Sequence, residues 1–210
     1  MKKYIFPIVA CMFAVLPSYA QVSVANGRGV INGHEYVDLG LSVKWATCNV
    51  GADSPSEYGD YYAWGEIKPK HEYEKTNGVM LPKKLFRISG NPQYDGATAN
   101  WGGTWRLPSR KELRELERKC RWVLTNVNGI EGYQIIGPNG NDILIPFAGY
   151  RYGRNLYYDK EYAFIWSEIA DVRNMDVAFS LGFSFHFDDK GAEPGWTYRY
   201  YGRSIRPVTE

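Results

Sequence analysis

Residues 100–120 read NWGGTWRLPSRKELRELERKC and contain the clearest local structure signal in the chain. Ser109 can accept a hydrogen bond from the backbone N–H three residues later, and Glu112 can bond back to the N–H of Ser109, which makes the capping box that opens a helix. Leu113 and Leu116 then follow at helical spacing, so one face of the helix is apolar and has a thiol near its end. We therefore expect a helix that begins after Ser109, surrounded by a β-rich chain.

Alternating apolar residues predict strands on both sides of this helix. Between Val37 and Trp45, every second residue is apolar, and the same alternation runs through residues 176–187. Residues 122–127 predict another strand, and residues 132–136 and 142–146 flank a Pro-Asn-Gly turn that is typical of a hairpin. Residues 196–208 are strand-like and interrupted by a glycine.

Two stretches lack this alternation. Residues 51–66 mix turn formers with aromatic side chains, which are expected to pack the loop onto the domain. Residues 67–99 hold three prolines and little periodicity, and we interpret them as a surface insertion that is free to move.

The N-terminal residues 1–20 are typical of a secretory signal peptide: two lysines, an apolar run from Tyr4 to Leu16, and a Ser-Tyr-Ala cleavage site. Lipoprotein processing at Cys11 is the alternative, which we disfavour because residues 12–16 stay apolar. The next segment, residues 21–36, is small and polar and is expected to be a flexible lead. Residues 37–210 would then form a single domain, with no second apolar run as long as the ~20 residues of a membrane span.

The total charge of the chain argues against an anionic partner. The chain has 25 basic and 23 acidic residues, and removal of Lys2 and Lys3 with the signal peptide leaves 23 of each. A neutral total does not predict a nucleic-acid-binding protein.

Only Cys48 and Cys120 follow the predicted cleavage site. In an exported chain, two cysteines favour one disulfide, and two buried free thiols are the alternative. The three histidines show no ligand spacing around either cysteine, so we expect no metal site and no cofactor.

Four motifs together resemble the Fibrobacter succinogenes major paralogous domain family: TCNVGA (47–52), YDGATANWGGTWRLPS (94–109), GPNGNDILIPFAGYR (137–151) and YYGRSIRPV (200–208). The resemblance covers essentially the whole chain after residue 36. It implies an α+β, C-type-lectin-like fold, with a twisted antiparallel β core, one or two helices and long loops. It also implies an exported, surface-associated protein, and it supports a disulfide between Cys48 and Cys120. The chain departs from the family pattern at Gly96 and Glu168.

We find no motif for catalysis. The sequence has no G-x-S-x-G elbow, H-E-x-x-H pair or phosphate-binding loop, and Asp188-Asp189 is explained by a solvated turn. Relatives of this fold that activate sulfatases depend on late cysteines, which are absent here after Cys120. The stretch Glu193-Pro194-Gly195 resembles a lectin calcium motif but lacks its asparagine, so calcium-dependent sugar binding is not expected.

Aromatic residues and arginines are the remaining candidates for function. Rings of Tyr and Trp beside Arg carry binding energy at low entropic cost and suit sugar faces or protein anchors. We therefore predict that the ligand contacts are Tyr157, Tyr158, Trp196, Tyr198, Arg199, Tyr200, Tyr201 and Arg203. The alternative is that half of each alternating set is core, as we expect for Ile205 and Val208.

Three functions are therefore carried forward. The first is a secreted, non-enzymatic recognition module that binds a glycan or a surface protein through residues 186–203, a segment that could also be a diversified region. The second is a structural component of a bacterial surface or pilus assembly. The third is a hydrolase whose site the sequence does not reveal.

Overall fold

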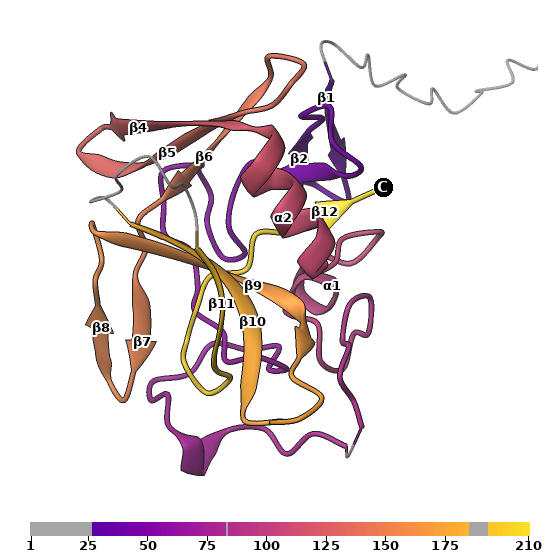
Figure 1. The fold of residues 1–210 in the computed structure, drawn as a ribbon, viewed down its shortest axis with the longest axis vertical. Coiled ribbons are helices and arrows are strands. Elements are labelled where there is room, and N and C mark those ends of the chain that lie inside the picture. Colours follow the sequence, from indigo (N-terminus) through magenta and orange to yellow (C-terminus); the bar gives the residue numbers. More distant parts are fainter. Residues whose placement is uncertain (1–26, 83, 185–192) are drawn as a thin grey trace, which may run out of the picture.

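Helix α2 (Arg110–Lys119) forms where the capping box predicts it, in a computed structural model that describes residues 27–82, 84–184 and 193–210. Ser109 Oγ accepts a hydrogen bond from the Glu112 N–H at 3.2 Å, and a Glu112 carboxylate oxygen accepts one from the Ser109 N–H at 2.7 Å. Leu113 and Leu116 are fully buried, so the predicted apolar face is confirmed. The helix lies beside strands β9 and β10 and leads directly into β4 (Figure 1).

The strands of the described chain form four antiparallel sheets. In spatial order, the sheets are β1 (Arg28–Ile31), β2 (His34–Val37), β3 (Lys44–Ala46) and β12 (Val208–Thr209); β11 (Glu193–Tyr198), β10 (Val177–Ser184) and β9 (Tyr162–Ala170); β4 (Arg121–Val127), β5 (Ile130–Ile136) and β6 (Asp142–Pro146); and β7 (Tyr150–Tyr152) with β8 (Asn155–Tyr157). A short helix α1 (Gly96–Trp101) and a 3-10 turn η1 (Lys75–Asn77) complete the described elements. The architecture is therefore α+β and mainly antiparallel, as expected.

The strands around the predicted hairpin are confirmed. Strands β5 and β6 pair from Gly132↔Pro146 to Ile136↔Asp142, and Gly140 in the turn has a φ of +87°, which favours glycine. Strand β4 covers the predicted residues 122–127 and pairs along the whole of β5.

Three predictions about the first half of the chain need correction. Residues 28–37 are a β-hairpin rather than part of a flexible lead, because Asn32 and Gly33 both adopt positive φ and form the tight turn that joins two strands. The alternation from Val37 to Trp45 does match burial, but the backbone turns between β2 and β3 instead of forming a continuous strand. The insertion at residues 67–99 is fixed by buried Tyr73 and Ile88.

Asp95 holds the end of this insertion and begins helix α1, which the sequence analysis did not predict. The carboxylate is buried and accepts hydrogen bonds from the N–H groups of Ala97, Thr98, Gly90 and Leu107, at 2.8–3.2 Å. An aspartate before a short run of small residues is an N-cap signal, so this helix start was readable in the sequence.

Three hydrophobic clusters fill the interior. The largest joins α2 to strands β2, β3, β5, β6, β9 and β10. The second contains four tryptophans together with Ile205, and the third lies around Tyr61 and Tyr73. Ile205 and Val208 are both buried, as expected.

The structure does not contain the disulfide predicted between Cys48 and Cys120, because both are free thiols. Cys48 follows β3 and its sulfur lies 3.6 Å from the Thr47 hydroxyl, whereas Cys120 caps α2 and packs against the largest core cluster. Burial raises the pKa of the Cys120 thiol to about 11. Two cysteines in one chain establish that a pair is available, but only the fold determines whether their Cα atoms come within bonding reach.

Several predictions lie outside the described residues. They are the signal peptide at residues 1–20 with Cys11, residues 21–26 of the lead, the last part of the strand predicted at 176–187, and residues 186–192 of the proposed binding segment with Asp188 and Asp189.

Candidate functional site

A continuous group of tyrosine rings covers the outer side of β7, β8 and the loop after β11. Two rings are central to it: Tyr150 stacks on Tyr201 at 5.0 Å and on Tyr157 at 5.7 Å. Tyr201 in turn contacts Tyr152, Tyr198 and Tyr200 at 5.1–5.8 Å between ring centroids. We call this group the tyrosine surface: Tyr150, Tyr152, Tyr157, Tyr158, Tyr198, Tyr200 and Tyr201.

Main-chain pairing brings these distant segments together. The N–H of Arg151 donates to the Gly202 carbonyl at 2.8 Å, and the Gly202 N–H donates back at 2.9 Å. Tyr73 pairs in the same way with Gly153, which directly follows β7. A Cβ at Gly202 would lie 2.7 Å from the Tyr73 ring, so only glycine fits where these three segments meet.

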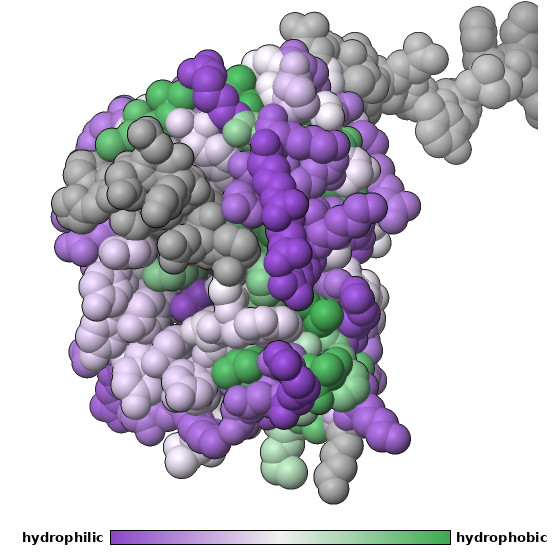
Figure 2. All heavy atoms as spheres, viewed as in Figure 1, coloured by the Kyte–Doolittle hydropathy of each residue, from purple (hydrophilic) through white to green (hydrophobic). Residues whose placement is uncertain are grey.

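Four rings of the tyrosine surface are open to solvent. Tyr158 is 51% exposed, Tyr198 48%, Tyr152 42% and Tyr157 38%. Figure 2 shows this part of the molecule, over β7 and β8, in the pale colours of intermediate hydropathy. The predicted candidates Tyr157, Tyr158, Tyr198, Tyr200 and Tyr201 therefore belong to one patch.

The backbone at Tyr158 is left-handed, with a φ of +56°. A bulky residue adopts this conformation at a cost of roughly 1–3 kcal/mol, and such strain persists where the surrounding structure fixes it. Here the Tyr158 carbonyl accepts hydrogen bonds from the N–H groups of Glu161 and Tyr162, which holds the turn with its ring facing outward.

Arg203 lies under the tyrosine surface rather than in it. The side chain is buried, and its guanidinium carbon lies 4.2 Å from the ring centroid of Phe164, 5.3 Å from that of Trp166 and 5.7 Å from that of Tyr150. It donates hydrogen bonds to the hydroxyls of Ser180 and Thr197. Complete burial lowers the pKa of this guanidinium, and the surrounding rings supply cation–π attraction in place of a carboxylate. The prediction of Arg203 as a ligand contact is therefore wrong, because its side chain is buried beneath the rings.

Two further predicted residues lie elsewhere. Arg199 is partly buried and donates a hydrogen bond to the Val79 carbonyl at 3.4 Å, which ties the loop to the insertion. Trp196 is 39% exposed, but its ring contacts are Phe179 and the guanidinium of Arg110, beside α2. Tyr150 and Tyr152 also belong to the patch, and because they lie on either side of Arg151 in a strand, their side chains are on the same face.

Burial raises the pKa of Tyr150, Tyr200 and Tyr201 above the ordinary value for a phenol, and neighbouring tyrosines make the second-largest contribution. These phenols are therefore neutral at physiological pH. The tyrosine surface offers flat rings and hydroxyl groups, which suit the apolar face and hydroxyl edge of a sugar or a hydrophobic anchor on another protein.

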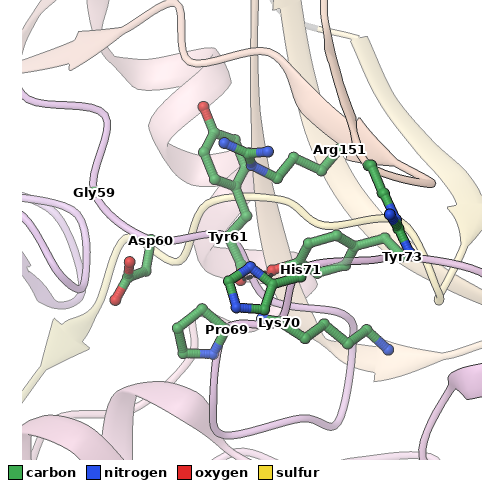
Figure 3. Close-up of a pocket in the computed structure, with 9 residues that line it drawn as sticks. Gly59, Asp60, Tyr61, Pro69, Lys70, His71, Tyr73 and Arg151 are labelled. Carbon is green, nitrogen blue, oxygen red and sulfur yellow. Dashed lines mark hydrogen bonds between the residues drawn. The ribbon is translucent and has the colours of Figure 1, made fainter.

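An open depression of about 730 Å³ lies beside β7 and adjoins the third core cluster (Figure 3). The guanidinium of Arg151 lies 5.0 Å from the Tyr61 ring, while Lys70 and Arg154 are already paired with Glu66 and Glu72. The lining has a single carboxylate, Asp60, so the depression lacks a pair of acidic groups for glycoside hydrolysis.

No cluster of three potential metal ligands occurs among residues 27–82, 84–184 and 193–210. Within the same ranges, no helix combines the length and apolar character of a membrane span. Comparison with known proteins gives no matching family model, curated protein or solved structure.

Proposed function

We propose that this chain is an exported, non-enzymatic recognition module that binds a glycan through the tyrosine surface. The observation that carries the proposal is the patch itself: seven tyrosines from three separate segments contact one another in a continuous series, and four of them are open to solvent. A chain that needed only a stable fold would bury such rings, since each carries a large apolar area.

Rigidity supports the same function. The rings are supported by one another, by buried Arg203 and by the strained turn at Tyr158. A preorganised aromatic platform loses little entropy on binding, which is the property that makes tyrosine frequent in recognition sites.

The finer fold assignment belongs to this proposal. An antiparallel α+β core with long irregular connections is compatible with the C-type-lectin-like fold that the resemblance to the Fibrobacter family implies. Secretion by the segment at residues 1–20 is proposed on the same footing, and it would place the tyrosine surface where glycans are met.

The test is a glycan array probed with the purified protein. Tyr198→Ala and Tyr158→Ala are each expected to weaken binding of the selected glycan at least tenfold, because stacking against a sugar depends on the aromatic ring. Tyr198→Phe should retain most of the affinity if the ring face is the contact. Leu124→Ala, at another exposed apolar position, is the matched control. Unchanged affinity in both alanine variants would refute the proposal.

A structural role in a surface assembly is the second candidate, and one observation favours it. Leu124 and Val127 are exposed on β4, which is one of the two edge strands of its sheet. An unpaired strand with exposed apolar residues is a surface on which another chain can add a strand. This role would be favoured instead if the protein purifies as a complex that Leu124→Lys disrupts, and if neither the unmodified protein nor its variants bind a glycan.

A further inference from the structure

The outer face of α2 carries a row of arginines. Arg110, Arg114 and Arg118 recur at every fourth residue and therefore share one side of the helix, with Lys111 next to them. We call these four residues the basic row. Figure 2 shows strongly hydrophilic side chains over α2.

The basic row lacks partners of opposite charge within the part of the chain that the structure describes. Among the described residues, none of its four cations forms an ion pair, although the neighbouring Lys119 pairs with Glu115. The Nε atoms of Arg110 and Arg114 are buried and have no hydrogen-bond partner in the described chain. Desolvation and the charge of Arg114 lower the pKa of Arg110, which indicates mutual repulsion.

This arrangement is unfavourable for the helix. Like charges four residues apart repel each other, and cations in the first turn oppose the positive end of the helix dipole. The dipole argument applies to Arg110 and Lys111 in the first turn, since Arg118 lies with Lys119 in the last turn, where a cation is favourable. The repulsion within the basic row is therefore not offset by any ion pair among the described residues, which points to an anionic ligand.

The row borders an open groove of about 780 Å³ that ends at Arg87, Glu168 and Ile169. The two carboxylates along the groove are already neutralised, because Glu168 pairs with Arg87 and Glu115 pairs with Lys119. Near the start of α2, the guanidinium of Arg110 lies 4.6 Å from the Phe179 ring and 5.5 Å from the Trp196 ring. These contacts hold Arg110 in place and leave Trp196 partly open beside it.

We propose that the basic row and Trp196 bind an acidic polysaccharide, with sulfate or carboxylate groups on the arginines and a sugar ring on Trp196. Successive arginines rise about 6 Å along the helix, so they suit a polymer with repeated anionic groups rather than a single small anion. A sugar is favoured over nucleic acid because the four cations, unpaired among the described residues, are fewer than the six to ten phosphate contacts that give strongly salt-dependent nucleic-acid binding. This inference goes beyond the function of the tyrosine surface and does not depend on it.

The test measures binding of the purified protein to immobilised heparin, with uncharged dextran, single-stranded DNA and duplex DNA as comparison ligands, over a range of salt concentrations. The triple variant R110Q/R114Q/R118Q is expected to lose at least tenfold in heparin affinity, and its salt dependence should fall by about one unit of slope per arginine removed. The matched control removes three exposed lysines elsewhere, K68Q/K84Q/K160Q, and should bind like the unmodified protein. Tyr198→Ala should also leave heparin binding unchanged.

Two more variants separate folding from binding. Arg118→Gln changes one exposed side chain and should weaken heparin binding about threefold even if the triple variant does not fold. Trp196→Ala should weaken binding at every salt concentration without changing the slope. The proposal is overturned by equal losses in the lysine control, by unchanged binding in the arginine variants, by absence of heparin binding in the unmodified protein, or by stronger binding of DNA than of heparin at equal salt.

Discussion

The tyrosine surface and the basic row use similar residue types in opposite ways. At the tyrosine surface the arginine is buried and the rings are outside, so Arg203 is bonded to hydroxyls and covered by Phe164 and Trp166. At the basic row the arginines are outside, and Arg110 lies over the buried ring of Phe179 and the partly exposed ring of Trp196.

The difference shows which arginines stabilise the fold and which are free for a ligand. Buried Arg206 makes the same point as Arg203: its guanidinium donates to Asn49, to the carbonyls of Ala46 and Thr47, and to the Leu144 carbonyl, without any carboxylate. The cations of the basic row have no such bonds in the described chain, so their contribution to folding is small or negative.

The largest expected effect separates these two classes of arginine. Arg203→Ala should lower the free energy of unfolding by about 3–5 kcal/mol, because it removes a buried side chain and leaves the Ser180 and Thr197 hydroxyls without a donor. Arg114→Ala is the matched control and should change stability by less than about 1 kcal/mol. Urea unfolding at neutral pH measures both, and equal losses would contradict the comparison.

A smaller effect is expected where β7 meets the C-terminal loop. Gly202→Ala should lower the free energy of unfolding by about 1–3 kcal/mol, because its Cβ would overlap the Tyr73 ring. Gly195→Ala has open space around its Cβ and is the control. Thermal unfolding checks the stability difference. Glycan binding should fall only for Gly202→Ala, since that position sets the distance between Tyr201 and Tyr150.

Alkaline pH should destabilise the folded tyrosine surface. The pKa values of Tyr150, Tyr200 and Tyr201 are raised in the folded protein, so the unfolded chain loses these protons first as the pH rises past about 10. Folding stability contributed by the neutral phenols is therefore complete below that pH and declines above it. Unfolding curves between pH 8 and 11 test this, and Tyr201→Phe should reduce the decline.

The smallest effect has the opposite sign. Arg114→Gln removes a like-charge neighbour from both Arg110 and Arg118 and should raise the free energy of unfolding by about 0.2–0.5 kcal/mol per pair at low salt. Added salt screens this repulsion, so the gain should shrink at high ionic strength. A loss of stability at low salt would show that Arg114 has a favourable partner.

The parts of the fold that were predictable depend on local chemistry. The capping box of Ser109 with Glu112 and the Asn-Gly turn of the β5–β6 hairpin are each set by residues within three positions of one another. The tyrosines were visible as a composition, but their assembly depends on the pairing of Arg151 with Gly202, which are far apart in sequence. The burial of Arg203 could not be inferred, because its surrounding rings come from β7 and β9.

The basic row could have been predicted from the sequence but was not. The order RKELRELERK places three arginines on one side of a helix, yet a neutral total charge suggested that no basic face exists. Trp196 was grouped with the late tyrosines because the register of β11 on β10, which sets it opposite Phe179, is not written in the local sequence.

Strand β12 has a practical consequence for anyone who immobilises this protein. Val208 and Thr209 are buried and pair with Trp45 and Lys44, and Val208 also exchanges main-chain hydrogen bonds with Arg106. If a carboxypeptidase removed these residues, the edge of β3 would lose its partner and part of the largest hydrophobic cluster would be exposed. A tether joined through a spacer after Glu210 would instead leave this strand intact and hold β7 and β8 on the far side of the molecule, facing the solution (Figure 1).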